Sequence, residues 1–175
     1  HFGIKVKKIF IIYPNQLFKL REQFSDVKYI ALIEDSLFFG CDTQWKQKFH
    51  CQKIIFHKAT MYYYEEILKN HGFKVIHLKH KRESRTEENL KYLKEKGFNH
   101  FIIYEAFDWS LEKRIKNFSQ QNNINLEIKR SEMFITCKNI SEEIINQKKI
   151  YGMQKFYRNQ RKNLNILVEN DGSAT

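Results

Sequence analysis

The amino-acid sequence predicts an α/β fold in which a doubly wound, mainly parallel sheet carries helices on both faces. Short apolar runs alternate with longer amphipathic stretches through most of the 175 residues, as expected of repeated strand–helix units. The apolar runs are rich in β-branched and aromatic residues and are apolar almost throughout, which is typical of strands buried on both faces. One proline and six glycines argue against a loop-rich architecture.

Five segments are predicted to be strands, at residues 8–13, 27–34, 73–78, 101–104 and 124–128. Helices are predicted between them, at about 43–71, 84–97 and from 108 onward. With right-handed crossovers this order gives a Rossmann-like sheet of roughly five strands, whose ligands bind beyond the carboxyl ends of the strands. Those ends carry Pro14 to Gln16, Glu34 to Ser36 and Glu105 to Trp109.

The segment at 43–71 is predicted to be one long helix, capped by Asp42 or Thr43 and ended by Gly72, with room for a break near its middle. The side chains expected to face the core recur at helical spacing: Trp45, Phe49, Phe56, Ala59, Tyr63 and Ile67. The next helix is expected to begin with a capping box of Ser84 and Glu87, and the one after it at Asp108.

The character of the sequence changes after Cys137. Residues 140–149 and 153–164 are predicted to be helical and strongly polar, and residues 168–175 resemble a linker or a frayed end. We therefore expect an α/β domain over residues 1–138 and a helical extension with a linker over residues 139–175.

Charge and cysteine content restrict the partners and the compartment. The net charge of +11 favours anionic partners such as nucleic acid, although a Lys-rich solvated surface explains it equally well. The three cysteines, Cys41, Cys51 and Cys137, form no C-x-x-C pair, so neither a disulfide framework nor a metal site is supported and a cytoplasmic location is expected. No apolar run is long enough to span a membrane, so no membrane partner is expected.

The common catalytic and phosphate-binding motifs are absent from the sequence. It holds no G-x-G-x-x-G, no P-loop, no H-E-x-x-H and no G-x-S-x-G, so we predict no catalytic residue and no metal ligand. Glu34 at the end of a strand suits a ring N–H or hydroxyl of a ligand, or equally the amides that follow it. A basic stripe is expected along the long helix, formed by Lys46, His50, Lys53 and His57. His77 and His80 belong to a basic run that we interpret as a solvated loop.

Taken in order, the motifs of this chain resemble those of the photolyase-related protein family, also described as iron–sulfur bacterial cryptochromes and prokaryotic (6-4) photolyases. The resemblance covers nearly the whole chain. Each motif alone is weak, and the motifs indicate this family only when they are taken together in their order along the chain. The motifs are Pro14 to Phe18, Leu32 to Phe39, Phe49 to Met61, Glu105 to Trp109, Met133-Phe134 and Met153 to Arg161.

The resemblance implies a large flavoprotein for light-driven DNA repair or signalling, of which this chain is the N-terminal domain. That domain would hold a light-harvesting antenna, 6,7-dimethyl-8-ribityllumazine or a similar compound. FAD and an iron–sulfur cluster would belong to a C-terminal domain, which would be the partner of this chain and would act on DNA. The residues carried over to the antenna site are Pro14, Asn15, Gln16, Leu17, Glu34, Phe49, His50, Lys53 and Glu105.

Two other functions remain open from the residues alone. The first is a stand-alone nucleic-acid-binding or interaction module, which would use Arg158 and Arg161 on the late basic helix. The second is a small α/β enzyme with His50 or His57 as a base, although no nucleophile is apparent beside either histidine.

Overall fold

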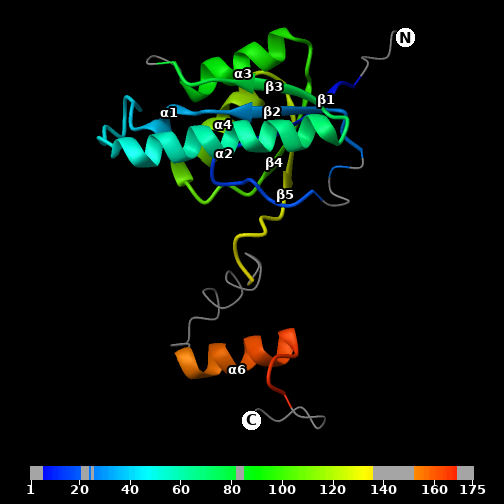
Figure 1. Cartoon of the computed structure of the whole chain (residues 1–175). Coiled ribbons are helices and arrows are strands. Elements are labelled where there is room, and N and C mark those ends of the chain that lie inside the picture. Colours follow the sequence, from blue (N-terminus) through cyan, green and yellow to red (C-terminus); the bar gives the residue numbers. More distant parts are fainter. Residues whose placement is uncertain (1–5, 21–23, 25, 82–84, 136–151, 169–175) are drawn as a thin grey trace. The chain divides into compact units, whose positions relative to one another are not determined.

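The computed structural model describes residues 6–20, 24, 26–81, 85–135 and 152–168. The chain divides into two compact units, His1–Ser131 and Glu132–Thr175. The first unit contains the whole sheet and the helices that pack on it, and the second contains one described helix (Figure 1).

The sheet of the first unit has five strands, all parallel, in the order β3-β2-β1-β4-β5. The strands are β1 (Lys8–Ile12), β2 (Tyr29–Ile33), β3 (Lys74–Leu78), β4 (His100–Tyr104) and β5 (Asn125–Lys129). The predicted doubly wound α/β fold is therefore confirmed, and every predicted strand is present. Because β1 and β4 are neighbours while the chain runs outward from each of them, the strand order reverses between these two strands.

Helices cover both faces of this sheet. The helices are α1 (Ser36–Phe39), α2 (Cys51–Asn70), α3 (Thr86–Glu95) and α4 (Trp109–Gln121). α2 packs on one face, together with the connection between β1 and β2, whereas α3 and α4 pack on the other (Figure 1). Alternate residues of β1 serve the two cores, with Phe10 and Ile12 facing α2 and Ile9 and Ile11 facing α3 and α4.

The long helix begins later than the sequence predicted, at Cys51 instead of about residue 43. The carboxylate of Asp42 accepts the amides of Gln44 and Trp45, at 2.9 Å each, and so draws them away from a helical pattern. The segment also folds closely over Gly40, which has a φ of 71° and where a Cβ atom would lie 2.4 Å from the carbonyl oxygen of Gln47. Neither Asp42 nor Thr43 is the cap, because the ring Nδ1 of His50 accepts the Gln52 amide at 3.2 Å.

The predicted core-facing stripe of this helix is mostly wrong, since Ile67 packs against the core but its other members within α2 do not. Phe56 and Tyr63 are 64% and 72% exposed, and the buried residues of α2 are Met61, Tyr64 and Leu68. The prediction placed Phe56 and Tyr63 on the same helical face as the aromatic residues of segment 43–50. Because that segment is not helical, the spacing from it does not show which face of α2 is buried.

The remaining helix predictions have mixed outcomes. Asp108 caps α4 as expected, since its carboxylate accepts the Leu111 amide at 3.0 Å. α3 is capped at Arg85, whose amide donates to the carboxylate of Glu88 at 3.1 Å, so the expected Ser84–Glu87 box is not the one used. Ser84 itself, the helix expected at 140–149, the boundary at 138/139 and Cys137 lie outside the described residues.

The described helix of the second unit is α6 (Met153–Leu164), which matches the predicted helix at 153–164. None of its residues is buried, and it carries four basic and no acidic side chains. The guanidinium of Arg161 donates to the carbonyl oxygens of Ile166 and Leu167, which follow the end of the helix. Arg158 is exposed.

Candidate functional site

The first part of the candidate site lies where the strand order reverses, between the carboxyl ends of β1 and β4. Gln16 is 1% exposed and joins the two strand ends. Its side-chain Oε1 accepts the Tyr13 amide at 3.3 Å, and its Nε2 donates to the carbonyl oxygen of Glu105 at 3.3 Å. Pro14 is buried, and Asn15 and Leu17 are half-buried on the same turn. Gln16 therefore fixes the ends of β1 and β4 relative to each other.

Glu105 extends this arrangement to β5. Its amide donates to the carbonyl oxygen of Lys129 at 2.8 Å, and its carboxylate accepts the Ser131 amide at 3.3 Å. These bonds hold the ends of β4 and β5 together, so Glu105 and Gln16 both stabilise this edge of the sheet.

The second part of the site is a buried charge network around Glu34, just after β2. Glu34 has a fully buried side chain. Its Oε2 accepts the amide of His80 at 2.8 Å and the ammonium group of Lys58 at 3.1 Å, and its Oε1 accepts Nε2 of His77 at 3.2 Å. The three donors come from α2, from β3 and from the residues after β3. A carboxylate has about four acceptor positions, so one position on Oε1 is left.

His77 connects Glu34 to a second carboxylate. Its Nδ1 lies 2.6 Å from Oε2 of Glu65 on α2, and its side chain is only 3% exposed. Both ring nitrogens face carboxylates, which only accept hydrogen bonds when ionised, so this geometry requires the imidazolium form. The interpretation of His77 as part of a solvated loop was therefore wrong, because alternation along β3 turns it inward, toward the same face as Val75.

This network shifts the titration of its members in opposite directions. Burial alone would raise the pKa of Glu34, but the hydrogen bonds from His77, His80 and Lys58 outweigh it and lower the pKa from 4.5 to about 2. Burial alone would lower the pKa of His77, but its bonds to Glu34 and Glu65 raise it above 6.5. Both shifts favour the charged forms, so the network is ionised around neutral pH.

An aromatic cluster adjoins Glu34 at the same edge of the sheet. The ring of Phe39 stacks on the ring of His80, with centroids 4.8 Å apart, and lies 6.1 Å from the ring of His57. Phe38 lies 6.3 Å from His57 on another side. Both ring nitrogens of His57 are buried and have no hydrogen-bond partner among the described residues. Burial, and then the charge of Lys53, lower the pKa of His57, which keeps its ring neutral.

A further buried polar group lies on the α3–α4 side of this edge. The hydroxyl of Tyr13 has no hydrogen-bond partner in the described part of the chain, and burial followed by the charge of Asp35 raises its pKa well above 10. Asp35 itself is fully buried and caps α1 through the amide of Leu37, at 3.0 Å. Asp35 therefore stabilises the turn between β2 and α1.

Three predicted site residues, Phe49, His50 and Lys53, lie at the start of α2, and none of them is among the printed partners of Glu34. Lys53 is exposed, and its ammonium group lies 3.6 Å from the ring centroid of Phe49. His50 is exposed and is used as the helix cap. The stripe of Lys46, His50, Lys53 and His57 does not exist as one helical face, because Lys46 and His50 precede the helix. Of this stripe, His57 belongs to the aromatic cluster, and Lys53 acts on it through its charge.

The residues that sequence reasoning missed are Lys58, Glu65 and the inward-facing His77. A signal for them was present, because Lys58 and Glu65 are seven residues apart and so share one side of α2. Their pairing with His77 depends on the packing of α2 against β3, which no local pattern reveals.

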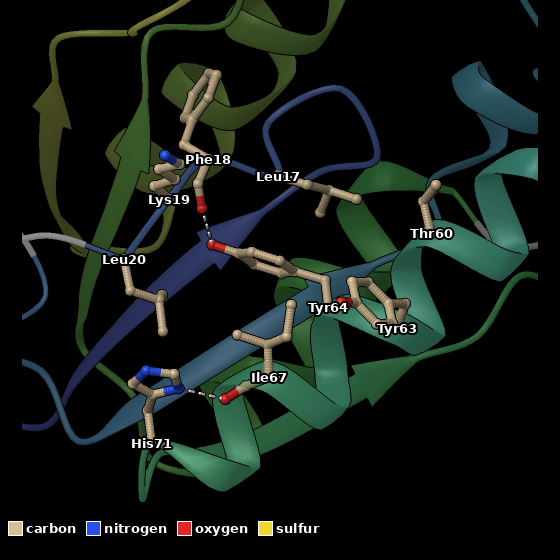
Figure 2. A pocket seen from close by; sticks show the side chains of 9 residues that line it. All are labelled: Leu17, Phe18, Lys19, Leu20, Thr60, Tyr63, Tyr64, Ile67 and His71. Atoms are coloured by element: carbon tan, nitrogen blue, oxygen red, sulfur yellow. Dashed lines mark hydrogen bonds between the residues drawn. The ribbon is translucent and has the colours of Figure 1, made fainter.

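A different kind of site lies on the other side of α2. A groove of about 460 Å³ separates the second half of this helix from residues 17–20, which follow β1 (Figure 2). Its lining is mostly apolar, and Leu17 is the only predicted site residue in it. Within the part of the chain that the structure describes, no group of three His, Cys, Asp or Glu side chains is arranged to hold a metal ion, and no helix is long and apolar enough to cross a membrane.

Comparison with known proteins decides the family. The sequence model of the family described as deoxyribodipyrimidine photo-lyase-related protein matches residues 10–175. The chain belongs to the photolyase-related protein family. An uncharacterized protein of Acanthamoeba polyphaga mimivirus is 30% identical to it over 172 residues, which cover 94% of this chain and 86% of the viral protein.

Proposed function

We propose that this chain is the antenna-binding domain of a photolyase-related flavoprotein and that it holds a planar chromophore at the carboxyl edge of its sheet. The chromophore would be 6,7-dimethyl-8-ribityllumazine or a similar compound. The protein would then be of the iron–sulfur bacterial cryptochrome or prokaryotic (6-4) photolyase type. It would be cytoplasmic, in keeping with the free thiols of Cys41 and Cys51.

The observation that carries this proposal is the environment of His57. Buried polar atoms in folded proteins almost always have hydrogen-bond partners. Here both ring nitrogens of one residue lie among the rings of Phe38, Phe39 and Phe56 with no partner in the described residues. A flat heterocycle with carbonyl and N–H groups matches both the aromatic walls and the two nitrogens, and Glu34 adjoins this cluster through its hydrogen bond from the His80 amide.

In this arrangement the chain binds and orients the chromophore and excludes water from it. The chromophore supplies light absorption, and the excitation passes to a flavin. The acceptor would be FAD in a C-terminal domain of the same protein, which also would contact DNA. Glu34 is held ionised and oriented by His77 and Lys58, so it can accept a ring N–H or a ribityl hydroxyl at a fixed position.

Titration of the chain with 6,7-dimethyl-8-ribityllumazine, followed by fluorescence, tests the proposal. His57→Phe keeps a ring of similar shape but removes both nitrogens, and we expect it to weaken binding at least tenfold. Glu66→Gln, at an exposed position of the same helix, is the matched control and should bind like the wild type. Because His57→Phe removes buried unpaired polar atoms, it should not lower stability.

Two results would contradict the proposal in different ways. No binding by the folded wild-type chain would reject the antenna function. Equal binding by wild type and His57→Phe would place the ligand away from the carboxyl edge, and the groove variant Ile67→Glu would then show whether the groove holds it.

A further inference from the structure

The groove beside α2 has the size and shape of a small-molecule site. Leu17, Phe18 and Leu20 form one wall, and Thr60, Tyr63 and Ile67 form the other, facing them across the groove (Figure 2). Its volume of about 460 Å³ falls in the range of roughly 300–1,000 Å³ that is usual for ligand pockets. Such pockets combine an apolar lining with a few polar groups, as this one does.

A single buried tyrosine sets the width of the groove. Tyr64 is 5% exposed, and its hydroxyl donates to the carbonyl oxygen of Phe18 at 2.7 Å, across the groove (Figure 2). Its ring packs in the core with Met61 and Leu68, and this packing holds the ring in place. The two walls are therefore tied together before any ligand binds, which reduces the entropy lost on binding.

The polar groups around the groove are of two kinds. The hydroxyl of Thr60 donates back to its own helix, 2.9 Å from the carbonyl oxygen of Phe56, so it offers no hydrogen to a ligand. The groups that can carry charge are Lys19 and His71, and no acidic residue is among the lining residues. Nδ1 of His71 lies 2.8 Å from the carbonyl oxygen of Ile67 and must carry a proton, so Nε2 can donate a hydrogen bond to an anion only in the imidazolium form.

We propose that this groove is a second ligand site, separate from the carboxyl edge, and that it binds a flat aromatic anion. The aromatic part would lie between Tyr63 and the leucines of the opposite wall, and the anionic group would pair with Lys19 or His71. The chemistry favours an anion over a cation because every chargeable lining group is basic. This site does not depend on the antenna function, since none of His57, Glu34 and Phe39 lines it and Leu17 is the one predicted antenna residue among its lining residues.

The probe for this proposal is 8-anilino-1-naphthalenesulfonate, a flat aromatic anion, titrated by fluorescence against the whole chain. Ile67→Glu places a carboxylate between the walls and should weaken binding at least tenfold. Tyr63→Glu is a second variant at a 72% exposed position, where the fold tolerates the change. Ile55→Glu is the matched control, because Ile55 is 63% exposed on the same helix but outside the groove, and it should leave binding unchanged.

The sign of the ligand charge is tested separately. N-phenyl-1-naphthylamine has the same rings without the sulfonate and should bind at least threefold more weakly, and Lys19→Glu should weaken binding of the sulfonate by a similar factor. Equal binding of both probes would overturn the anion assignment. Unchanged binding in both Ile67→Glu and Tyr63→Glu would overturn the site. A concentration-dependent dimer that Ile67→Glu abolishes would instead assign the groove to a second copy of the chain.

Discussion

The carboxyl edge and the groove lie on opposite sides of one helix, yet their chemistry has almost nothing in common. At 100° per residue, the buried stripe of α2 (Met61, Tyr64 and Leu68) is flanked on one side by Lys58 and Glu65 and on the other by Thr60 and Ile67. The first flank meets β3 and the buried His77, so its charges are paired. The second flank meets the apolar residues after β1, and one neutral hydrogen bond crosses it.

This difference teaches that the two sites are held in shape by forces that respond to different conditions. The carboxyl edge depends on ionised groups and must respond to pH, whereas the groove depends on apolar packing and a neutral hydrogen bond. Variants and pH should therefore separate the two regions, even though they share a helix.

The largest effect is expected from Glu34→Gln at the carboxyl edge. The change removes the charge that three donors surround, leaves the ammonium of Lys58 without its carboxylate and leaves the imidazolium of His77 with only the carboxylate of Glu65. Removing one partner of a buried ion pair costs several kcal/mol, so we expect a loss of about 3 kcal/mol in unfolding free energy. Urea denaturation at pH 7 measures it.

The exposed control Glu66→Gln should stay within about 0.5 kcal/mol of the wild type. A loss below about 1 kcal/mol for Glu34→Gln would mean that the buried network contributes little to the unfolding free energy. The carboxyl edge would then not differ from the groove in its dependence on ionised groups.

The second prediction concerns the pH dependence of the same network. The folded pKa of His77 is raised above 6.5, so its stabilising contribution is complete below pH 6.5 and is lost as the pH rises through the folded value. The folded pKa of Glu34 is lowered to about 2, so its contribution is complete above pH 4.5 and is lost as the pH falls toward 2. The wild type should therefore exceed His77→Gln by about 2 kcal/mol near pH 5.5, and by less at pH 9.

Thermal or urea unfolding of both proteins between pH 3 and pH 9 gives this difference. A stability difference that stays constant from pH 5.5 to pH 9 would show that His77 contributes by packing and not as an imidazolium.

The sequence predicted the fold better than it predicted the site. The strands were found because β-branched, apolar runs depend on local composition, and the cap at Asp108 was found because capping is a local hydrogen bond. The start of α2 was missed because Asp42 and Gly40 act through a turn that helical periodicity cannot detect. Lys58 and His77, two partners of Glu34, lie 24 and 43 residues after it in the sequence, so only the packed structure brings them to it.

The third prediction moves to the groove, where Tyr64→Phe removes one neutral hydrogen bond to Phe18. A net hydrogen bond is worth about 1 kcal/mol, so we expect a loss of that size in unfolding free energy, and the loss should be the same at pH 5.5 and pH 9. Tyr63→Phe, at a 72% exposed position, is the control and should leave stability unchanged. A loss that varied with pH would indicate that the groove is also tied to charged groups.

The smallest effect is expected from Lys53→Ala, which tests whether Phe49, His50 and Lys53, at the start of α2, belong to the carboxyl edge. The exposed Lys53 lies over the half-buried ring of Phe49, and such a contact contributes only about 0.5 kcal/mol. Its charge also lowers the pKa of His57, after burial, so removing it should raise that pKa. Nuclear magnetic resonance titration of the His57 ring measures the shift, with the exposed Lys48→Ala as control. An unchanged His57 titration would place Lys53, and with it Phe49 and His50, outside the electrostatic reach of the site, leaving Glu34, His57 and the Pro14–Leu17 turn as the residues that define it.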